Sequence, residues 1–230
     1  MNEVIPRRGL GEKWEQFLLR QIEPAHSEPY WKFGERLVDE ELLPMLQRFN
    51  VNRETALELG CGIGRLFIPM SRFFRKMVGV DISDGAIRRI AGFARRRGIT
   101  NARFVTIRDP AELLTAVPVV AGQLSFLYCF QVFPHIQDFT ITETYLKAVT
   151  QLLMSDGIAY LSFDTRRQTP TYHAKTAMPD LLLPRCWRRG MRRIRREPSQ
   201  IEGALAECGL LILEQLGRNT SDHRYVVCPK

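Results

Sequence analysis

Short apolar runs alternate with amphipathic segments from Thr55 to the end of the chain. Strands that alternate with helices in this way form a parallel sheet with helices on both faces. The sequence therefore predicts an α/β fold with a doubly wound, mostly parallel seven-stranded sheet. The predicted strands are Ala56–Leu59, Met77–Val80, Ala102–Ile107, Gln123–Phe130, Ile158–Asp164, Leu210–Gln215 and Arg224–Cys228. The predicted helices between them are Gly64–Phe74, Gly85–Arg97, a short one after Pro110, and Thr140–Met154.

Both ends of the chain depart from this alternation. The last two strands are separated only by residues 217–222, so they are predicted to form an antiparallel hairpin. The helix before them is predicted to start at a capping box of Ser199 and Glu202 and to end at Gly209. The first fifty residues predict a helical N-terminal cap (1–50), broken at 24–29 and kinked at Pro44, in front of a core domain (51–230).

The net charge of +8 comes from 33 Lys and Arg against 25 Asp and Glu. Residues 185–196 hold seven Arg and no acidic residue, so the rest of the chain is close to neutral as a whole. Any binding of a polyanion is therefore expected from this arginine segment.

The chain has no apolar stretch near the roughly 18 to 20 residues of a membrane-spanning helix. Its N-terminus also has no apolar core of the signal-peptide type, so no membrane association and a cytoplasmic location are expected. The five cysteines are scattered and have no metal-ligand spacing. We expect free thiols and no metal site.

The segment ELGCGIGR (58–65) follows the first predicted strand directly and opens the next helix. Its glycines Gly60, Gly62 and Gly64 allow a tight turn and let a ligand approach the backbone. The second strand ends in VGVDIS, with Asp81 at its tip. A carboxylate at this place can accept hydrogen bonds from both hydroxyls of a ribose. Together the two motifs predict a nucleotide-like ligand.

The glycine spacing separates two classes of cofactor. A dinucleotide site has the pattern GxGxxG, whereas here the pattern is GxGxG and Arg65 takes the sixth position. The acidic Glu58 would repel a pyrophosphate but would attract the amino group of a methionine. Both observations favour S-adenosylmethionine over NAD.

With these motifs, the chain resembles the class I S-adenosylmethionine-dependent methyltransferases from about Tyr30 to its C-terminus. The resemblance rests on ELGCGIG, on VGVDIS, on a third strand that ends in Arg108 and Asp109, and on LYCFQVFPHI (127–136). It implies a Rossmann-like methyltransferase fold whose final hairpin is reversed. Two positions depart from the common pattern: Arg108 stands in place of Gly, and Gln123 in place of Asp.

The resemblance also implies the contacts to the cofactor. Glu58 and the loop after it, which contains the three glycines, Cys61 and Arg65, would line the methionine end. Asp81 would hold the ribose, Ile82 would pack on the adenine, and the pair Arg108-Asp109 would reach the adenine amino group. Phe130 and Gln131 would face the methyl donor. Tyr30 and Trp31 would close over the cofactor, with simple packing of an N-terminal helix on the sheet edge as the alternative. Cys61 is expected to be a small packing residue and not a nucleophile.

The candidate catalytic residue is His135, since its imidazole titrates near neutral pH close to the expected reaction centre. A structural histidine that caps the following turn is the alternative. Residues 166–198 form a candidate substrate lid, in which Tyr172 and His173 are candidate substrate contacts.

Three functions are compatible with these residues. The first is methyl transfer from S-adenosylmethionine to an O, N or C nucleophile of a small-molecule acceptor. The second is methylation of RNA or another polyanion through the arginine segment. The third is a non-catalytic protein that binds S-adenosylmethionine. The arginine segment would then face an acidic substrate, an RNA backbone or only water.

Overall fold

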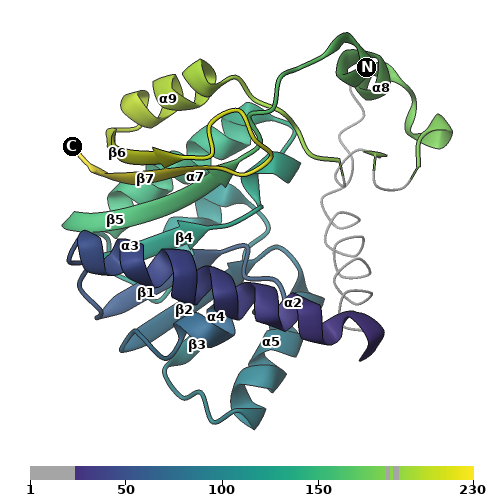
Figure 1. Ribbon diagram of the computed structural model, residues 1–230. Coiled ribbons are helices and arrows are strands. Elements are labelled where there is room, and N and C mark those ends of the chain that lie inside the picture. Colours follow the sequence, from purple (N-terminus) through teal and green to yellow (C-terminus); the bar gives the residue numbers. More distant parts are fainter. Residues whose placement is uncertain (1–23, 185–186, 189–191) are drawn as a thin grey trace.

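The computed structural model describes residues 24–184, 187–188 and 192–230. In this part of the chain, seven strands form one sheet in the order β3-β2-β1-β4-β5-β7-β6 (Figure 1). Strands β1 to β5 pair in parallel, whereas β7 is antiparallel to both β5 and β6. The predicted fold class is confirmed. The strands are β1 (Thr55–Leu59), β2 (Lys76–Asp81), β3 (Ala102–Thr106), β4 (Leu124–Cys129), β5 (Leu153–Phe163), β6 (Leu210–Leu216) and β7 (His223–Pro229).

The strand order reverses between β1 and β4. The chain enters the sheet at β1, runs outward to β3, and then returns to the other side of β1 as β4. In doubly wound sheets, ligands bind at such a reversal, outside the carboxyl ends of the strands. The motifs that follow β1, β2 and β4 all lie at this edge of the sheet.

Helices cover both faces of the sheet (Figure 1). One face is covered by α2 (Pro24–Leu37), the π-helical turn η1 (Val38–Leu42), α3 (Leu43–Arg48), α4 (Phe67–Met70) and α5 (Asp84–Arg96). The other face is covered by α6 (Leu113–Ala116), α7 (Phe139–Leu152) and α9 (Pro198–Glu207). The remaining elements are the 3₁₀ turns η2 (Pro110–Glu112), η3 (Phe133–His135) and η4 (Asp180–Leu182), and α8 (Pro170–Ala177).

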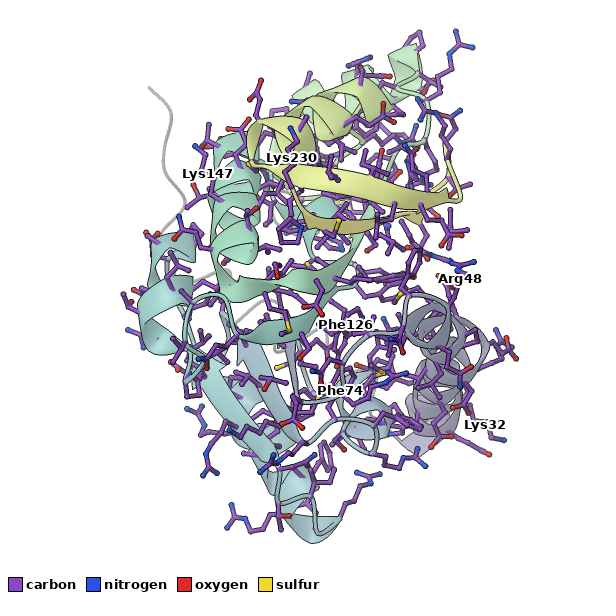
Figure 2. All side chains as sticks on the ribbon, turned by 90° about the vertical axis from the view of Figure 1, so that its left-hand side faces the viewer. Lys32, Arg48, Phe74, Phe126, Lys147 and Lys230 are labelled. Atoms are coloured by element: carbon purple, nitrogen blue, oxygen red, sulfur yellow. The ribbon has the colours of Figure 1, made fainter. Side chains whose placement is uncertain are left out.

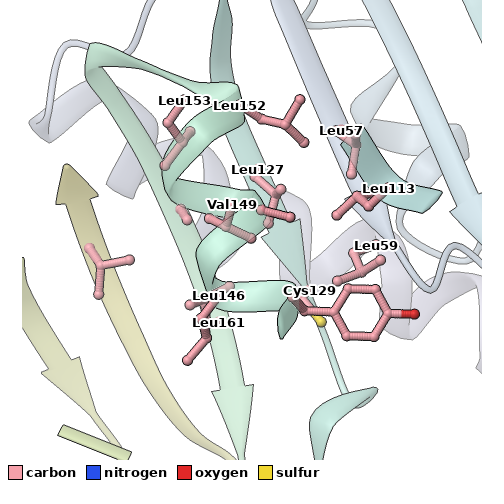
Figure 3. Close-up of a cluster of buried hydrophobic side chains, with 14 of the residues drawn as sticks. Leu57, Leu59, Leu113, Leu127, Cys129, Leu146, Val149, Leu152, Leu153 and Leu161 are labelled. Carbon is pink, nitrogen blue, oxygen red and sulfur yellow. The ribbon is translucent and has the colours of Figure 1, made fainter. Parts of the chain in front are cut away.

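The face under α7 is a largely apolar layer (Figure 3). Leu57 and Leu127 lie side by side on β1 and β4, Leu161 lies on β5 opposite the next inward residue of β4, and Leu146 and Val149 of α7 belong to the same cluster. All five side chains are fully buried. Truncation of one such leucine to alanine costs about 2–5 kcal/mol, so this layer fixes the positions of the strands that carry the site.

The opposite face is richer in aromatic rings. Phe74 stacks on Phe126 with ring centroids 5.9 Å apart, and both are labelled in Figure 2. Leu42 and Leu46 of the N-terminal helices are fully buried in the same cluster. The described part of the predicted N-terminal cap therefore shares its hydrophobic core with the sheet.

The N-terminal helices differ from the prediction. The predicted break at 24–29 is wrong, because α2 starts at Pro24 and continues through Pro29. A proline inside a helix removes one backbone hydrogen bond and crowds the preceding turn, and α2 tolerates Pro29 because its later turns pack on the sheet. Next to Pro44, the helix is irregular, since the π-helical turn Val38–Leu42 precedes α3. The helix predicted from Trp14 to Ile22 lies outside the described residues.

Three predicted boundaries also change. The helix predicted at Gly64–Phe74 shortens to α4, because Gly64 has a φ of +95° that no α-helix contains. The capping box is wrong: α9 starts with Pro198 after Glu197, and Glu202 pairs with Arg218 instead. β5 begins at Leu153, directly after α7. Gly209, with a φ of +77°, ends α9 as predicted.

Candidate functional site

The glycine loop turns sharply at the carboxyl end of β1. Gly60, Gly62 and Gly64 have φ values of +76°, +52° and +95°. A Cβ atom on Gly60 would lie 2.1 Å from a methyl group of Val132, so no other residue fits there. The Gly60 and Cys61 amides both donate to the Val80 carbonyl, at 2.7 and 2.9 Å. The loop is thereby fixed to the end of β2.

Asp81 links the two motifs directly. One carboxylate oxygen accepts a hydrogen bond from the Gly62 amide at 2.8 Å, and the other accepts from the Ser83 amide at 2.9 Å. Burial raises the pKa of Asp81, and the backbone hydrogen bonds oppose that increase. The carboxylate therefore holds the loop and the start of α5 in fixed positions.

Glu58 is a buried carboxylate, with 4% of its surface exposed. The Tyr128 hydroxyl donates to it at 3.0 Å, from the position opposite Glu58 on the neighbouring β4. Burial raises the pKa of Glu58 well above its usual value, whereas the Tyr128 hydrogen bond and the charge of Arg65 lower it. Asp81 raises it further by repulsion.

These two carboxylates fit a positively charged nucleoside. Each has a pKa raised by burial, so a positive charge near them is favourable, since it stabilises their ionised forms. S-Adenosylmethionine carries a sulfonium and an ammonium group as well as a ribose. The glycine loop, Glu58 and Asp81 provide the open backbone and the acceptors that such a molecule requires.

Cys61 is buried inside the loop. Burial raises the pKa of its thiol well above the usual value. Its sulfur lies 3.0 Å from the place where a side chain on Gly79 would begin, so the thiol fills the space above β2. A protonated, buried thiol is a packing group and a poor nucleophile.

Arg65 lies among three aromatic rings. Its guanidinium carbon is 5.1 Å from the ring centre of Tyr30, 4.8 Å from that of Phe33 and 5.8 Å from that of Phe130. The backbone of α2 also lies close to the backbone of Arg65, since a Cβ atom on Gly34 would be 2.1 Å from the Arg65 carbonyl oxygen. The glycine loop, α2 and the end of β4 are therefore packed together at this residue.

The two aromatic residues of α2 face different neighbours. Tyr30 lies over Arg65, and burial raises the pKa of its hydroxyl to about 12. Trp31 packs edge to face on Phe93 of α5, and Arg97 lies 5.3 Å from its ring centre. Tyr30 is thus brought to the glycine loop, whereas Trp31 attaches α2 to α5.

The residues predicted to contact the adenine form a looser group than the glycine loop and Asp81. Ile82 is exposed directly after Asp81. Arg108 is exposed and pairs with Asp84 at 3.0 Å, and the Asp109 carboxylate accepts from the Ala111 amide at the start of η2. The carboxyl group of Asp109 thus caps a turn in this structure.

The tip of β4 contains a strained residue. Gln131 has a φ of +57°, which is uncommon for a residue with a side chain. Its amide donates to the Ser162 hydroxyl on β5 at 2.6 Å, which holds the backbone in this conformation. Phe130, just before it, is buried against Arg65 and Phe33. Strained backbone of this kind concentrates at functional sites.

His135 ends the 3₁₀ turn η3, which follows the tip of β4. Its amide donates to the Val132 carbonyl at 2.9 Å, and the preceding residue, Pro134, accepts from the Ile194 amide at 2.5 Å. The imidazole is half-buried. The structure therefore brings His135 next to the described end of the arginine segment, 192–196.

Each of the four arginines at this end of the segment donates at least one hydrogen bond within the fold. Arg193 pairs with the fully buried Asp164 at 3.1 Å, which also pairs with Arg166 at 2.6 Å. Arg195 donates to the Arg167 carbonyl, and its guanidinium lies 4.6 Å from the ring centre of Tyr172. Tyr172 is buried, and its hydroxyl accepts from the Arg195 amide. Residues 192–196 are extended and not helical.

The remaining candidates lie at the periphery. Arg196 donates to the carbonyls of Ile136 and Gln137, and His173 is exposed on α8. Arg185 and Arg189 lie outside the described residues. Within the described ranges, no group of three or more His, Cys, Asp or Glu could hold a metal ion. No helix in those ranges is long and apolar enough to cross a membrane.

Comparison with known families decides the class of protein. The sequence profile of a family described as a methyltransferase domain matches residues 30–215. The chain belongs to this family. Together with the glycine loop, Glu58 and Asp81, this membership identifies an S-adenosylmethionine-dependent methyltransferase.

Solved structures agree on the fold of this methyltransferase. It is similar to an S-adenosylmethionine-dependent methyltransferase from Clostridium acetobutylicum, with a TM-score of 0.66 and 14% identity over 93% of this chain and 98% of the other. It is also similar to the magnesium protoporphyrin IX methyltransferase from Synechocystis, solved with bound SAH, with a TM-score of 0.62 and 19% identity over 88% and 86% of the two chains.

Two curated methyltransferases match in sequence. The ubiquinone biosynthesis O-methyltransferase of Rhizobium etli is 26% identical over 70% of this chain and 61% of its own length. The 23S rRNA (uracil(1939)-C(5))-methyltransferase of Aeromonas hydrophila is 43% identical, but over only 22% of this chain and 12% of its own length.

Three supporting residues could not be predicted from the sequence. Tyr128, Ser162 and Gly34 hold Glu58, Gln131 and Arg65, and each makes its contact to a residue at least 31 positions away in the chain. No local motif marks such partners. For Tyr128, the strand pattern could have helped, because side chains that lie opposite each other on neighbouring strands are in contact.

Proposed function

We propose that this methyltransferase transfers the methyl group of S-adenosylmethionine to an O, N or C nucleophile of a small-molecule acceptor. The proposal rests on how much of the chain is similar to each of two curated methyltransferases. Similarity to the ubiquinone biosynthesis O-methyltransferase spans 70% of the chain. Similarity to the rRNA enzyme is limited to a segment of 51 residues.

In this proposal, the chain holds the cofactor at three points. Glu58 accepts from the methionine ammonium group, and the backbone of the loop Gly60–Gly64 lies against the methionine part. Asp81 accepts from the ribose hydroxyls with the lone pairs that its two backbone bonds leave available. Ile82 packs on the adenine and Asp109 accepts from its amino group.

The acceptor site is proposed at the tip of β4. Phe130 and Gln131 face the methyl group there, and His135 lies one 3₁₀ turn further along the chain. Tyr30 and the described part of the cap (24–50) are proposed to close this region from the side of α2, and the described part of the lid, which includes α8, from the side of β5. In Figure 1, α8 in this lid projects away from the sheet.

The cofactor, when bound, supplies a methyl group already activated by the positive charge of its sulfonium. The chain contributes mainly position, because an in-line displacement needs the two reacting atoms about 3–3.5 Å apart and aligned. A fixed Gln131 backbone and a packed Phe130 are suited to that role. A base is needed only for a protonated acceptor, and then His135 is the group in reach. For an acceptor that needs no base, His135 has only its structural role in the turn η3.

The structural role of the arginine segment favours a small acceptor over RNA. The hydrogen bonds from Arg193, Arg195 and Arg196 end on Asp164 and on backbone carbonyls of the same chain. A guanidinium used in this way has fewer donors for a phosphate. The segment is therefore proposed to brace the ends of β5 and η3.

Calorimetry with S-adenosylhomocysteine tests the cofactor site. We expect binding by the wild-type chain and at least a tenfold weaker affinity for Asp81→Ala, because a ribose acceptor and two backbone bonds are lost. Transfer of a labelled methyl group to a panel of phenols, amines and carboxylic acids, with total RNA as a parallel acceptor, tests the acceptor class. The proposal is contradicted if the labelled methyl group appears in RNA but in none of the small molecules. Failure to bind the cofactor would favour a non-catalytic protein of this fold.

A further inference from the structure

A second basic surface lies outside the arginine segment. Residues 72–109 contain nine Arg and one Lys against three acidic residues, and all ten basic side chains are exposed. The near-neutral balance of the chain outside 185–196 conceals this surface, because acidic residues elsewhere cancel its charge. The segment forms β2, α5 and β3, at the end of the sheet opposite α9 and β6 (Figure 1).

The centre of this surface is the outer face of α5. Arg88, Arg89, Arg95 and Arg96 lie four and three residues before and after Gly92. Residues three and four apart share one face of a helix, so the four arginines surround a position without a side chain. The Arg96 guanidinium lies 3.4 Å from the place where a Cβ atom on Gly92 would be. We call these four arginines with Gly92 the α5 surface.

Gly92 weakens the helix on which the α5 surface lies. A glycine inside a helix is less favourable than an alanine, and Gly92 gains no close packing in return, since only the Arg96 side chain lies near the place of its missing Cβ atom. Asp84 is the one acidic residue of α5, and it pairs with Arg108. Sequences that break local rules without a gain in packing do so mainly at functional sites.

The surroundings of this surface favour a nucleic acid over a lipid surface. Between residues 72 and 109, all of which are described, Ile82 is the one exposed large apolar side chain, and it directly follows Asp81 of the proposed cofactor site. A single such side chain does not form an apolar face that could enter a membrane. Two partly exposed rings adjoin the arginines instead: Arg96 lies 4.9 Å from the ring centre of Phe93, and Arg97 packs on Trp31. Arginines next to aromatic rings are typical of surfaces that bind single strands through phosphates and stacked bases.

We propose that the α5 surface binds single-stranded RNA through its phosphate groups. This binding goes beyond the proposed function, because it does not depend on the identity of the methyl acceptor. It also moves the polyanion site from the arginine segment, whose described end braces the fold, to a helix whose arginines all face solvent.

The test is fluorescence anisotropy of the full chain with a labelled oligouridylate of about 20 nucleotides, between about 50 and 300 mM KCl. The α5 variant replaces Arg88, Arg89, Arg95 and Arg96 with Gln. The control variant, which loses the same net charge at other places, replaces Arg48, Lys147, Arg218 and Lys230 with Gln; all four are exposed, and three of them are labelled in Figure 2. Thermal unfolding and binding of S-adenosylhomocysteine verify that both variants are folded.

We expect the wild-type chain to bind the oligonucleotide and the α5 variant to bind at least tenfold more weakly at about 100 mM salt. The slope of log K against log salt should fall by up to about 3, since each phosphate contact to a single strand contributes about 0.7. The control variant should keep most of the affinity. The proposal is overturned by absence of wild-type binding at low salt, or by equal losses in both variants. It is also overturned if vesicles with anionic lipids compete for the same arginines more strongly than RNA does.

Discussion

The hydroxyl of Tyr128 offers a direct test of how the methionine end of the cofactor is recognised. It donates to the buried Glu58 carboxylate at 3.0 Å. Its neighbour Tyr160, opposite it on β5, donates in the same way to Glu41 at 2.5 Å. Tyr128→Phe and Tyr160→Phe are therefore matched variants: each removes one hydroxyl from one carboxylate, but only the first touches the proposed ammonium site.

The expected effect follows from the charge of Glu58. A hydrogen bond to a charged group contributes about 1.5–3 kcal/mol, and one pKa unit corresponds to about 1.4 kcal/mol. Loss of the hydroxyl should thus raise the pKa of Glu58 further, on top of the increase that burial causes. A carboxyl with a raised pKa loses its charge at a higher pH. The affinity of Tyr128→Phe for S-adenosylhomocysteine should consequently fall about tenfold to a hundredfold near neutral pH and recover as the pH rises.

The assay is calorimetry with two ligands between about pH 6.5 and 8.5, where the ligand ammonium stays mostly charged because the adjacent carboxylate of the same amino acid raises its pKa. 5′-Methylthioadenosine has no amino acid group, so its affinity should change less than about twofold in either variant. The reasoning is refuted if Tyr128→Phe weakens both ligands equally, or if Tyr160→Phe produces the same pH-dependent loss. A defect in cofactor binding as a whole would appear with both ligands, and thus remains distinguishable from a defect in the role of Tyr128.

Three further predictions concern the residues around the site. Gly34→Ala should destabilise the protein and weaken cofactor binding, because the new Cβ atom would lie 2.1 Å from the Arg65 carbonyl oxygen. The control Gly203→Ala, at an open helical position, should stabilise the protein by about 0.5–1 kcal/mol. Equal melting temperatures of the two variants would contradict the role of Gly34. Ser162→Ala should lower the free energy of unfolding in urea by about 1–3 kcal/mol and should also lower kcat. The reason is that the Gln131 amide, at the proposed reaction centre, would lose its hydrogen-bond partner. Ser125→Ala, which removes a 3.3 Å bond at the other end of β4, should change stability alone, and unchanged kcat in both variants would disprove the positioning role of the first. His135→Ala should keep kcat within about tenfold and leave its pH profile unchanged, whereas a loss of 10²–10⁴ would identify a general base.

The strand and helix pattern after Thr55 could be predicted because it depends on local signals. Alternating apolar runs, turn glycines and the capping Ser83 of α5 are all visible within a few residues. The predictions failed where packing overrode those signals. Helix α2 passes through Pro29 because its later turns are held by the sheet, and α4 is short because Gly64 is forced into a positive φ by the turn before it.

The candidate site divides in the same way. The glycine loop and Asp81 are recognisable as motifs in the sequence, whereas the 2.8 Å hydrogen bond that joins them is seen only in the structure. The role of the arginine segment did not follow from its composition. Charge counting could not foresee that Arg193 pairs with the buried Asp164, 29 residues earlier in the chain, or that a second set of arginines gathers around Gly92.

The sequence by itself determined the fold class and the cofactor, because each depends on residues adjacent in the chain or on the fixed period of a strand. Only the tertiary structure decided which groups support the motif residues and where the positive charge is exposed. The hydroxyl of Tyr128 reaches Glu58 from the neighbouring strand, and Asp164 pairs with Arg193 of a distant segment as well as with the nearby Arg166. Such contacts arise from the pairing of elements far apart in sequence, and that pairing is fixed by burial of the whole apolar core.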